Sequence, residues 1–182
     1  DSTYAYHHIF RNTPFWPCPG NHDYRSVCAI PCAQDPYNHT GVYYDIVTVP
    51  EQGEAGGEPS GLPHYYSFDY GNAHFISLNS ELGSPNDPDF AWIGAFASAG
   101  WNNSPMKTWL EDDLEQNDKT WTIAYWHQLP FSKGSHDSDD FWEVYMTAMR
   151  ENVVPLLESY GVDIIVCGHS HVYERSYLMN GF

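Results

Sequence analysis

The sequence predicts an α/β fold in which helices flank mixed β-sheets arranged as a sandwich. The second half of the chain alternates β-rich runs with helical runs, a pattern typical of a largely parallel sheet. A hairpin signal at residues 65–78 adds an antiparallel component. The chain has 182 residues, of which 42% are hydrophobic, so it can bury a sizeable core. We therefore expect residues 1–182 to form a single domain.

The first expected elements are extended. Prolines within residues 15–19 disfavour a helix, so this segment is predicted to be extended. Residues 42–49 alternate and are rich in β-formers, which predicts a strand. Two β-rich runs flanking a Gly-Asn pair predict the hairpin at 65–78. Residues 83–103 are rich in Gly, Pro and Asn and are expected to form a long loop.

A first helix is expected to begin near Ser104. This residue can cap a helix, and Pro105 suits the first helical position. The apolar face of this helix comprises Met106, Trp109, Leu110 and Leu114. A strand at 120–126 and a polar loop at 133–140 are expected to follow.

A second helix is expected over residues 140–151. Its inward face is predicted to comprise Phe141, Val144, Tyr145 and Met149. Pro155 is expected to kink this helix or to start a new turn, and Gly161 is expected to end it. The last expected strand covers residues 162–167.

Charge and hydropathy exclude several classes of partner. The formal net charge is -17, from 24 acidic and 7 basic residues. No basic stripe is available to neutralise nucleic-acid phosphates, so a nucleic-acid scaffold is not expected. No run of about 18 apolar residues is present, so no membrane span is expected. Any phosphate chemistry would need positive charge from a source other than Lys and Arg.

The four cysteines allow two interpretations. Cys18, Cys28 and Cys32 lie in a proline-rich region, and a disulfide among them would suit an oxidising compartment. The spacing of Cys28 and Cys32 could instead form a metal knuckle, although no second Cys/His pair at finger spacing accompanies it. Cys167 lies in an apolar run and is expected to be a buried free thiol.

Polar residues with metal-binding chemistry follow three of the extended segments. Asn21 and His22 follow the first segment, and His127 follows a predicted strand. His169 and His171 follow the last strand. Ligands of α/β proteins bind beyond the carboxyl ends of the strands, so these groups are expected to converge if the strands are neighbours. Imidazoles with an amide oxygen suit Zn, Fe or Mn, and a bound metal pair would attract an anion and activate water.

Each histidine also has an ordinary interpretation. A lone histidine such as His127 is more often a satisfied core or surface residue than a metal ligand. The His-x-His pair favours a ligand role, because Gly168 would let the backbone turn sharply after a buried strand. His136 lies in a polar loop and is either solvated or positioned over the site as an acid or substrate-binding group. His74 is expected to be paired locally, whereas four others are expected to be solvated: His7, His8, His39 and His64.

Four motifs lie in order along the chain. They are GNHDY at 20–24, WHQLPF at 126–131, KGSHDSD at 133–139 and CGHSHVYERS at 167–176. Together with the hairpin YYSFDYGNAHFISLNSE at 65–81, they resemble the calcineurin-like metallophosphoesterases, and within them the purple acid phosphatase branch. The resemblance covers most of the chain. It implies a metallophosphoesterase-type β-sandwich with a di-metal centre at the carboxyl edge of its strands.

The resemblance implies which residues bind the metals. Asn21, His127 and His169 would bind the second, divalent ion, and His171 would bind the first, usually iron. The implied cofactors are two metal ions, iron together with zinc, manganese or a second iron.

The resemblance also implies a reaction. The protein would be a phosphoric monoester or diester hydrolase in which a metal-bound hydroxide attacks phosphorus. His22 and His136 would be the catalytic and substrate-binding side chains, since imidazole titrates near the working pH. The implied partner is a phosphate ester substrate. The cysteines and the resemblance together predict an extracellular or periplasmic location.

The chain departs from the family pattern in two places. The family also uses a GD motif and a GDxxY motif before GNHD, and the nineteen residues that precede Gly20 contain neither. We therefore expect a fragment, incomplete at both ends, which by itself is a weak or inactive catalyst. It would self-associate through an exposed sheet edge or pack against additional domains of the same protein. The alternative is a non-catalytic, phosphatase-like structural or binding module. The second departure is Gln128-Leu129, where relatives often have His-Pro.

Overall fold

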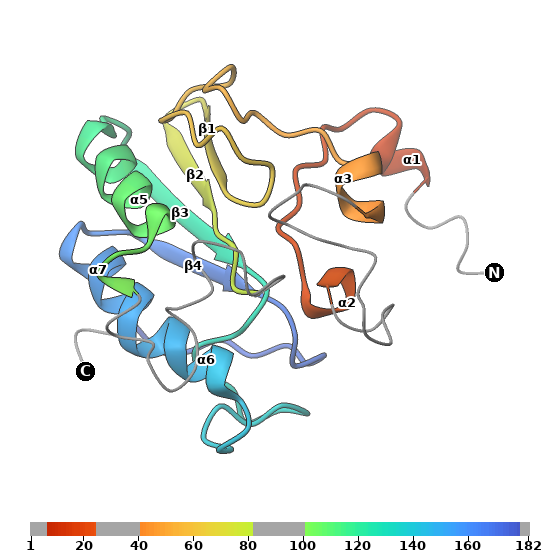
Figure 1. Cartoon of the computed structure of the whole chain (residues 1–182), viewed down its shortest axis with the longest axis vertical. Helices are drawn as coiled ribbons and strands as arrows, with labels where there is room; N and C mark the ends of the chain where they lie inside the picture. The colour runs from red at the N-terminus through yellow and green to blue at the C-terminus, as the bar shows by residue number, and fades with distance from the viewer. Residues whose placement is uncertain (1–6, 25–40, 82–100, 179–182) are drawn as a thin grey trace.

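The computed structural model describes residues 7–24, 41–81 and 101–178. Within them, a four-stranded sheet has the order β1-β2-β3-β4, formed by Tyr66–Tyr70, Ala73–Ser77, Trp121–Trp126 and Ile164–Cys167. Helices α5 (Pro105–Gln116), α6 (Val144–Ala148) and α7 (Val154–Ser159) lie on one side of the sheet, and the N-terminal elements lie on the other (Figure 1). The predicted α/β fold, with helices flanking a mixed sheet, is confirmed.

The sheet combines antiparallel and parallel pairing, as predicted. β1 and β2 are antiparallel, with Tyr70 opposite Ala73 across the hairpin turn. Gly71 in that turn has a φ of 62°, a left-handed conformation that glycine adopts at little cost. The β2–β3 and β3–β4 pairs are parallel. The carboxyl ends of β2, β3 and β4 therefore meet at the same edge of the sheet.

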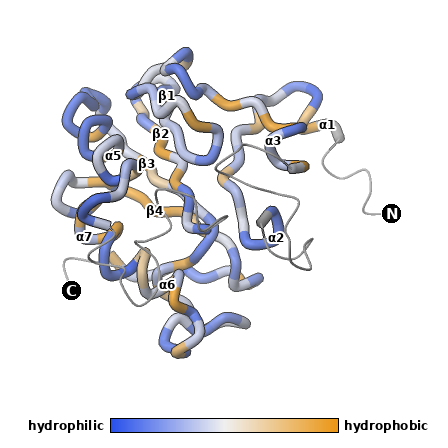
Figure 2. The backbone as a smooth tube through the Cα atoms, in the orientation of Figure 1, coloured by the Kyte–Doolittle hydropathy of each residue, from blue (hydrophilic) through white to orange (hydrophobic). Residues whose placement is uncertain are grey.

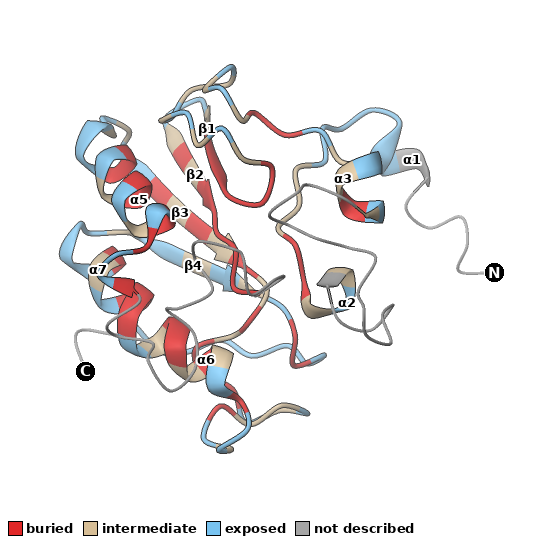
Figure 3. Cartoon of the chain, viewed as in Figure 1, coloured by how far each residue is buried: buried red, intermediate tan, exposed pale blue. Residues whose placement is uncertain are grey.

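The hydrophobic core lies between the sheet and three helices, α5 (Pro105–Gln116), α6 (Val144–Ala148) and α7 (Val154–Ser159). On the strands it includes Ile76, Ala124 and Trp126, and on and between the helices it includes Met106, Trp109, Leu110, Leu114, Ala148, Met149, Val153, Val154 and Leu157. Figure 3 shows buried residues on all three helices and along β2 and β3. Full burial of each large apolar side chain contributes about 1.5–3 kcal/mol, so this cluster holds the sheet edge in place.

Helix α5 begins as predicted. The Ser104 hydroxyl accepts a hydrogen bond from the Lys107 backbone N–H at 3.2 Å, and Pro105 occupies the first turn. All four residues predicted for the apolar face are buried: Met106, Trp109, Leu110 and Leu114.

The second predicted helix begins later than expected. Consecutive turns precede it, with hydrogen bonds from Asp140 N to Asp137 O and from Glu143 N to Asp140 O. The helix α6 therefore begins only at Val144. The prediction that Phe141 and Val144 face inward is wrong, since their exposed fractions are 85% and 40%.

The rest of this helical segment changes type at the predicted proline. A π-helical turn at Met149–Val153 joins α6 to α7. Pro155 lies in the first turn of α7, where its missing N–H needs no helical partner. Met149 is buried as predicted, and Gly161 follows the helix with a φ of 74°. The new turn predicted at Pro155 is confirmed.

Residues 42–49 contain a helix and not the predicted strand. The helix α3 covers Val42–Ile46. Its Tyr43 is buried, and the hydroxyl lies 3.0 Å from the Pro17 carbonyl and 3.1 Å from the Pro63 carbonyl. These distant contacts outweigh the local β-propensity of the segment, which is strongly context-dependent.

The sheet face turned away from the helices is also apolar. Trp16 covers part of it, with its ring 4.5 Å from the Phe68 ring and its carbonyl 2.9 Å from the Tyr125 hydroxyl. Four other side chains of this face are exposed: Tyr70, Trp121, Ile164 and Val166. Figure 2 shows hydrophobic residues along β4. A second sheet, which the predicted sandwich would place here, is not among the described residues.

Two predictions concern other parts of the chain. The loop predicted at 83–103 falls mostly outside the described residues, which resume at Trp101. Across the described ranges, no helix is long and apolar enough to cross a membrane.

Candidate metal centre

Three side chains from distant parts of the chain meet at the carboxyl edge of the sheet. Asn21 begins α2 (Asn21–Tyr24), His127 follows β3 and His169 lies just after β4. His127 Nε2 lies 2.8 Å from Asn21 Oδ1 and 3.1 Å from His169 Nδ1. Parallel pairing explains the second contact, because Trp126 is opposite Cys167. The structure brings these three predicted residues together, and their role as metal ligands stays a prediction.

Two glycines lie against the His127 ring, and one of them, Gly20, makes room for it. A Cβ added to Gly20 would lie 2.9 Å from His127 Nδ1, and one added to Gly168 would lie 3.4 Å from the same atom. Gly20 is held by Asp23, whose carboxylate accepts a hydrogen bond from the Gly20 N–H at 2.8 Å. The Gly168 N–H donates to the His127 carbonyl at 3.0 Å. Gly20 of GNHD therefore leaves space for the imidazole, and Gly168 of GHSH holds the His127 backbone by a hydrogen bond.

The sharp turn of GHSH falls on its histidines. His169 has a φ of 71° and His171 a φ of 48°, and they are the non-glycine residues with positive φ in the described part of the chain. Gly168 is not among the positive-φ residues, so the prediction that it provides the turn is wrong. A left-handed backbone conformation at a non-glycine residue costs about 1–2 kcal/mol of folding free energy. Strain of this kind persists where surrounding contacts fix it, and it clusters at functional sites.

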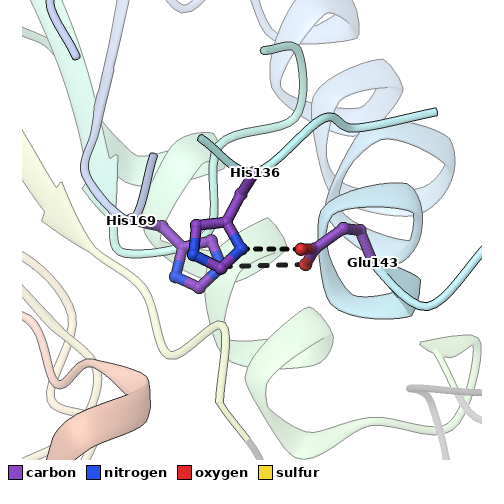
Figure 4. A group of neighbouring side chains, drawn as sticks. All are labelled: His136, Glu143 and His169. Carbon is purple, nitrogen blue, oxygen red and sulfur yellow. Dashed lines mark hydrogen bonds and ion pairs between the residues drawn. The ribbon is translucent and has the colours of Figure 1, made fainter. Parts of the chain in front are cut away.

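A second group of side chains lies around Nε2 of His169, the ring nitrogen that faces away from His127. The His136 ring lies over the His169 ring, with centroids 4.0 Å apart and planes tilted by 38°. His136 Nδ1 is 2.7 Å from Glu143 Oε1, and His169 Nε2 is 3.7 Å from Glu143 Oε2 (Figure 4). His136 is therefore placed over the site rather than simply solvated. Sequence reasoning missed Glu143, because no motif includes it.

Serine hydroxyls hold the loop that carries His136. Ser170 Oγ accepts a hydrogen bond from the His136 N–H at 3.2 Å, and the Ser135 hydroxyl donates to the Ser170 carbonyl at 2.6 Å. The Ser132 hydroxyl lies 2.7 Å from both Ser170 Oγ and Glu174 Oε2. The KGSHDSD and GHSHVYERS motifs are therefore linked directly, which fixes His136 beside His169.

Burial and neighbouring imidazoles keep His127 neutral. Desolvation by burial, followed by the charges of His169, His22, His171 and His136, lowers the pKa of His127 to about 4. The pKa of His169 is also lowered, mainly by burial. Metal ions bind the neutral form of imidazole. Both rings are therefore in the neutral charge state that metal ions bind.

The donor set fits a first-row transition metal ion. Two neutral imidazole nitrogens and an amide oxygen suit Zn, Fe or Mn better than a hard cation, which prefers several oxygens. His22 and His171 are exposed at the margin of this group. They lie near enough to lower the pKa of His127, and neither shares the hydrogen bonds that join Asn21, His127 and His169.

A model of the calcineurin-like phosphoesterase family matches residues 2–173 of the chain. The chain belongs to this family. The resemblance to calcineurin-like metallophosphoesterases is thereby confirmed, and relatives named as purple acid phosphatases support that branch.

This calcineurin-like phosphoesterase is similar to several longer proteins. An acid phosphatase from Aspergillus ficuum is 29% identical over 67% of this chain and 24% of its own length. Purple acid phosphatase 23 from Arabidopsis thaliana is 32% identical, and the match covers 61% of this chain and 20% of the relative. A Mycobacterium tuberculosis protein is 27% identical, and the match covers 94% of this chain and 29% of the relative. A solved purple acid phosphatase, PPD1 from yellow lupin seeds, has a TM-score of 0.45 and 18% sequence identity. The match covers 84% of this chain and 24% of the PPD1 chain. The chain spans less than a third of each relative.

The cysteines of this calcineurin-like phosphoesterase differ in part from the prediction. Cys18 is a free thiol, so the expected disulfide is wrong for this residue. Burial raises the pKa of Cys18 to about 12. Cys167 is free as predicted but is only partly buried, and desolvation raises its pKa well above the ordinary range. Cys28 and Cys32 lie outside the described residues.

Predictions for the other histidines had mixed outcomes. His74 is paired locally as predicted, at 2.8 Å from Asp69 and 2.8 Å from Asp113. His64, expected to be solvated, is 4% exposed and packs edge-on against Tyr65, so that prediction is wrong. His39 and the side chains of His7 and His8 lie outside the described part.

Gln128 has a structural position beside the site. Its Nε2 donates to Glu81 Oε1, and its backbone N–H donates to the Ser80 hydroxyl at 3.0 Å. Its side chain therefore belongs to a buried polar network behind His127.

Proposed function

We propose that this chain carries part of the metal centre of a metal-dependent phosphoester hydrolase of the acid phosphatase type. The observation that carries the proposal is the meeting of Asn21, His127 and His169, with separations of 2.8 Å and 3.1 Å between their ligand atoms. Three segments far apart in the sequence present neutral donors at one point. Membership of the calcineurin-like phosphoesterase family supports the same conclusion.

These three residues would hold the second metal ion, and His171 would contribute to the first. Two bound ions would polarise a phosphate ester and activate water. They would also supply the positive charge that a protein with a net charge of -17 otherwise lacks near an anionic substrate.

His136 and His22 would act on the substrate. His136 is held above His169 with Nδ1 engaged by Glu143, so its Nε2 would be the ring atom that contacts the phosphate group. His22 is exposed on α2 next to Asn21, where it would protonate the leaving oxygen.

Isothermal titration calorimetry with Zn²⁺ tests the proposal on the chain itself. We expect wild-type protein to bind Zn²⁺, and the His169→Ala and His127→Ala variants to lose that site. His8→Ala is a matched control, because His8 belongs to α1 (His7–Phe10), which contributes no residue to the site. A wild-type chain that binds no Zn²⁺, or a His169→Ala variant that binds equally well, would refute the proposal.

Hydrolysis of p-nitrophenyl phosphate tests the catalytic part. We expect the metal-loaded 182-residue chain to be weakly active or inactive, because the GD and GDxxY motifs are absent from it. A longer protein that contains this sequence together with both motifs should be active and should lose activity in His169→Ala. Inactivity of that protein with metal bound would favour the non-catalytic alternative. The extracellular or periplasmic location stays a prediction.

A further inference from the structure

We propose that Glu143 is a positioning residue that fixes the proton positions of His169 and His136. The inference rests on the proposed function, in which His169 Nδ1 binds metal. Glu143 comes directly before α6, and its carboxylate points toward both rings (Figure 4). Its side chain is 11% exposed, so the carboxylate interacts with the rings largely shielded from water.

The hydrogen-bond chain through the site determines which nitrogen of His169 carries a hydrogen. Asn21 Oδ1 only accepts, so His127 Nε2, at 2.8 Å, donates to it. The same hydrogen faces His169 Nδ1 at 3.1 Å, so that nitrogen is an acceptor. A neutral imidazole with a bare Nδ1 carries its hydrogen on Nε2. That nitrogen is the one that faces Glu143 Oε2, at 3.7 Å.

The other carboxylate oxygen of Glu143 fixes the second ring. An ionised carboxylate only accepts, so His136 Nδ1, at 2.7 Å from Oε1, is the donor. The two neighbouring rings therefore direct one N–H each toward separate oxygens of the same carboxylate. His136 Nε2 is then the ring nitrogen left for substrate, and the side chain is 40% exposed, as a group that reaches substrate must be.

A carboxylate behind a metal-binding histidine has a known physical effect. It fixes the ring orientation and tautomer and raises the basicity of the ligand nitrogen, and its loss typically weakens metal affinity about 10- to 100-fold. The bare Nδ1 of His169, which faces His127 and Asn21, is the nitrogen that Glu143 keeps free for metal. Glu143 therefore acts through His169 and does not need to touch the ion.

Long-range ¹H–¹⁵N NMR spectra of the metal-free chain test the tautomers directly. We expect wild-type His169 to be in the Nε2–H form, and Glu143→Ala to give a mixture of both tautomers. Glu151→Ala is the matched control, because Glu151 is an exposed glutamate in the π-helical turn that follows α6. Unchanged His169 and His136 tautomers in Glu143→Ala would overturn the proposal.

Zn²⁺ titration gives the second readout. We expect Glu143→Ala to weaken affinity about 10- to 100-fold, with partial recovery in Glu143→Asp, and Glu151→Ala to bind as wild type. Complete loss of binding in Glu143→Ala, as in His169→Ala, would make Glu143 a ligand and overturn the positioning role. If circular dichroism shows that Glu143→Ala is unfolded, the near-isosteric Glu143→Gln replaces it in both experiments.

The two readouts separate this inference from the proposed function. A wild-type chain that binds no Zn²⁺ but shows the tautomer change in Glu143→Ala would refute the metal centre and keep the effect of Glu143 on the rings. A wild-type chain that binds Zn²⁺ with an affinity and tautomers unaffected by Glu143→Ala would keep the metal centre and refute the positioning role.

Discussion

Removing the carboxylate of Asp113 is expected to destabilise the fold strongly and to change how its stability depends on pH. The Asp113 side chain is fully buried on α5. Its Oδ2 lies 2.8 Å from His74 Nε2, and its Oδ1 accepts hydrogen bonds from the Glu58 N–H at 2.8 Å and from the Ser67 hydroxyl. Asp69 lies on the other side of the His74 ring, at 2.8 Å from Nδ1.

The contacts of Asp113 set the expected magnitude. Asp113→Ala leaves a buried imidazole without one of its two carboxylates and leaves two donors without an acceptor. Removing one partner of a buried ion pair costs about 3–5 kcal/mol. Asp113→Asn keeps the volume and the Oδ1 acceptor, so we expect a loss of about 1–3 kcal/mol. Asp112→Ala is the control, because Asp112 is exposed on the same helix and should change stability by about 0.5 kcal/mol or less.

The pH dependence follows from the His74 pKa. Burial lowers this pKa, but the hydrogen bonds and charges of Asp113 and Asp69 outweigh burial and raise it above its ordinary value of 6.5. Protonated His74 therefore stabilises the folded state. That stabilisation is fully present below pH 6.5 and is lost as pH rises through the raised pKa. The free energy of unfolding should fall with rising pH in wild type, with a smaller slope in Asp113→Ala.

Urea unfolding monitored by tryptophan fluorescence, from about pH 6 to about pH 9, measures both effects. The reasoning would be refuted if Asp113→Ala were within about 0.5 kcal/mol of wild type at the acid end. It would also be refuted if the pH slope in Asp113→Ala and in His74→Gln matched that of wild type.

Three further predictions concern the site and the thiols. Gly20→Ala should weaken Zn²⁺ affinity about tenfold in calorimetry, because its Cβ would lie 2.9 Å from His127 Nδ1. In Gly168→Ala the added Cβ would lie 3.4 Å from the same atom, so this variant should bind Zn²⁺ nearly as well as wild type. An equal loss of Zn²⁺ affinity in the two variants would contradict the steric explanation. Zn²⁺ at about 100 times its Kd should stabilise the chain by about 2.7 kcal/mol in urea unfolding, reversed by EDTA, and no shift would argue against a folded-state site. Cys18 is partly buried and its pKa is raised to about 12, so it should react with Ellman's reagent much more slowly in the native chain than in the unfolded chain, and equally fast native labelling would contradict the raised pKa.

Local signals in the sequence predicted the elements whose cause is local. The cap at Ser104 and the spacing of the α5 apolar face depend on neighbouring residues, and both were confirmed. The strand prediction for the segment that contains α3 was wrong, because the Tyr43 hydroxyl is held by carbonyls 26 and 20 residues away in the sequence. No local pattern encodes such a contact.

The candidate site shows the same division. His127 and His169 could be expected to meet because the parallel strands β3 and β4 place their carboxyl ends at one edge. Asn21 joins them from a segment, residues 14–20, that forms no strand. Glu143 could not be found in this way. Its direction depends on the turns that delay α6, and those turns depend on backbone hydrogen bonds that the composition of the segment does not reveal.

At His169 and His171, the residue that would best stabilise the left-handed backbone is not the residue that can bind a metal ion. Glycine or asparagine would relieve a conformation that costs an L-residue about 1–2 kcal/mol, but neither provides an imidazole. A library of this chain selected for heat resistance should therefore enrich glycine and asparagine at both positions. The same library selected for metal retention should keep histidine at position 169. Opposite enrichment under the two selections would measure, within living cells, how much stability the GHSH turn gives up to hold its rings.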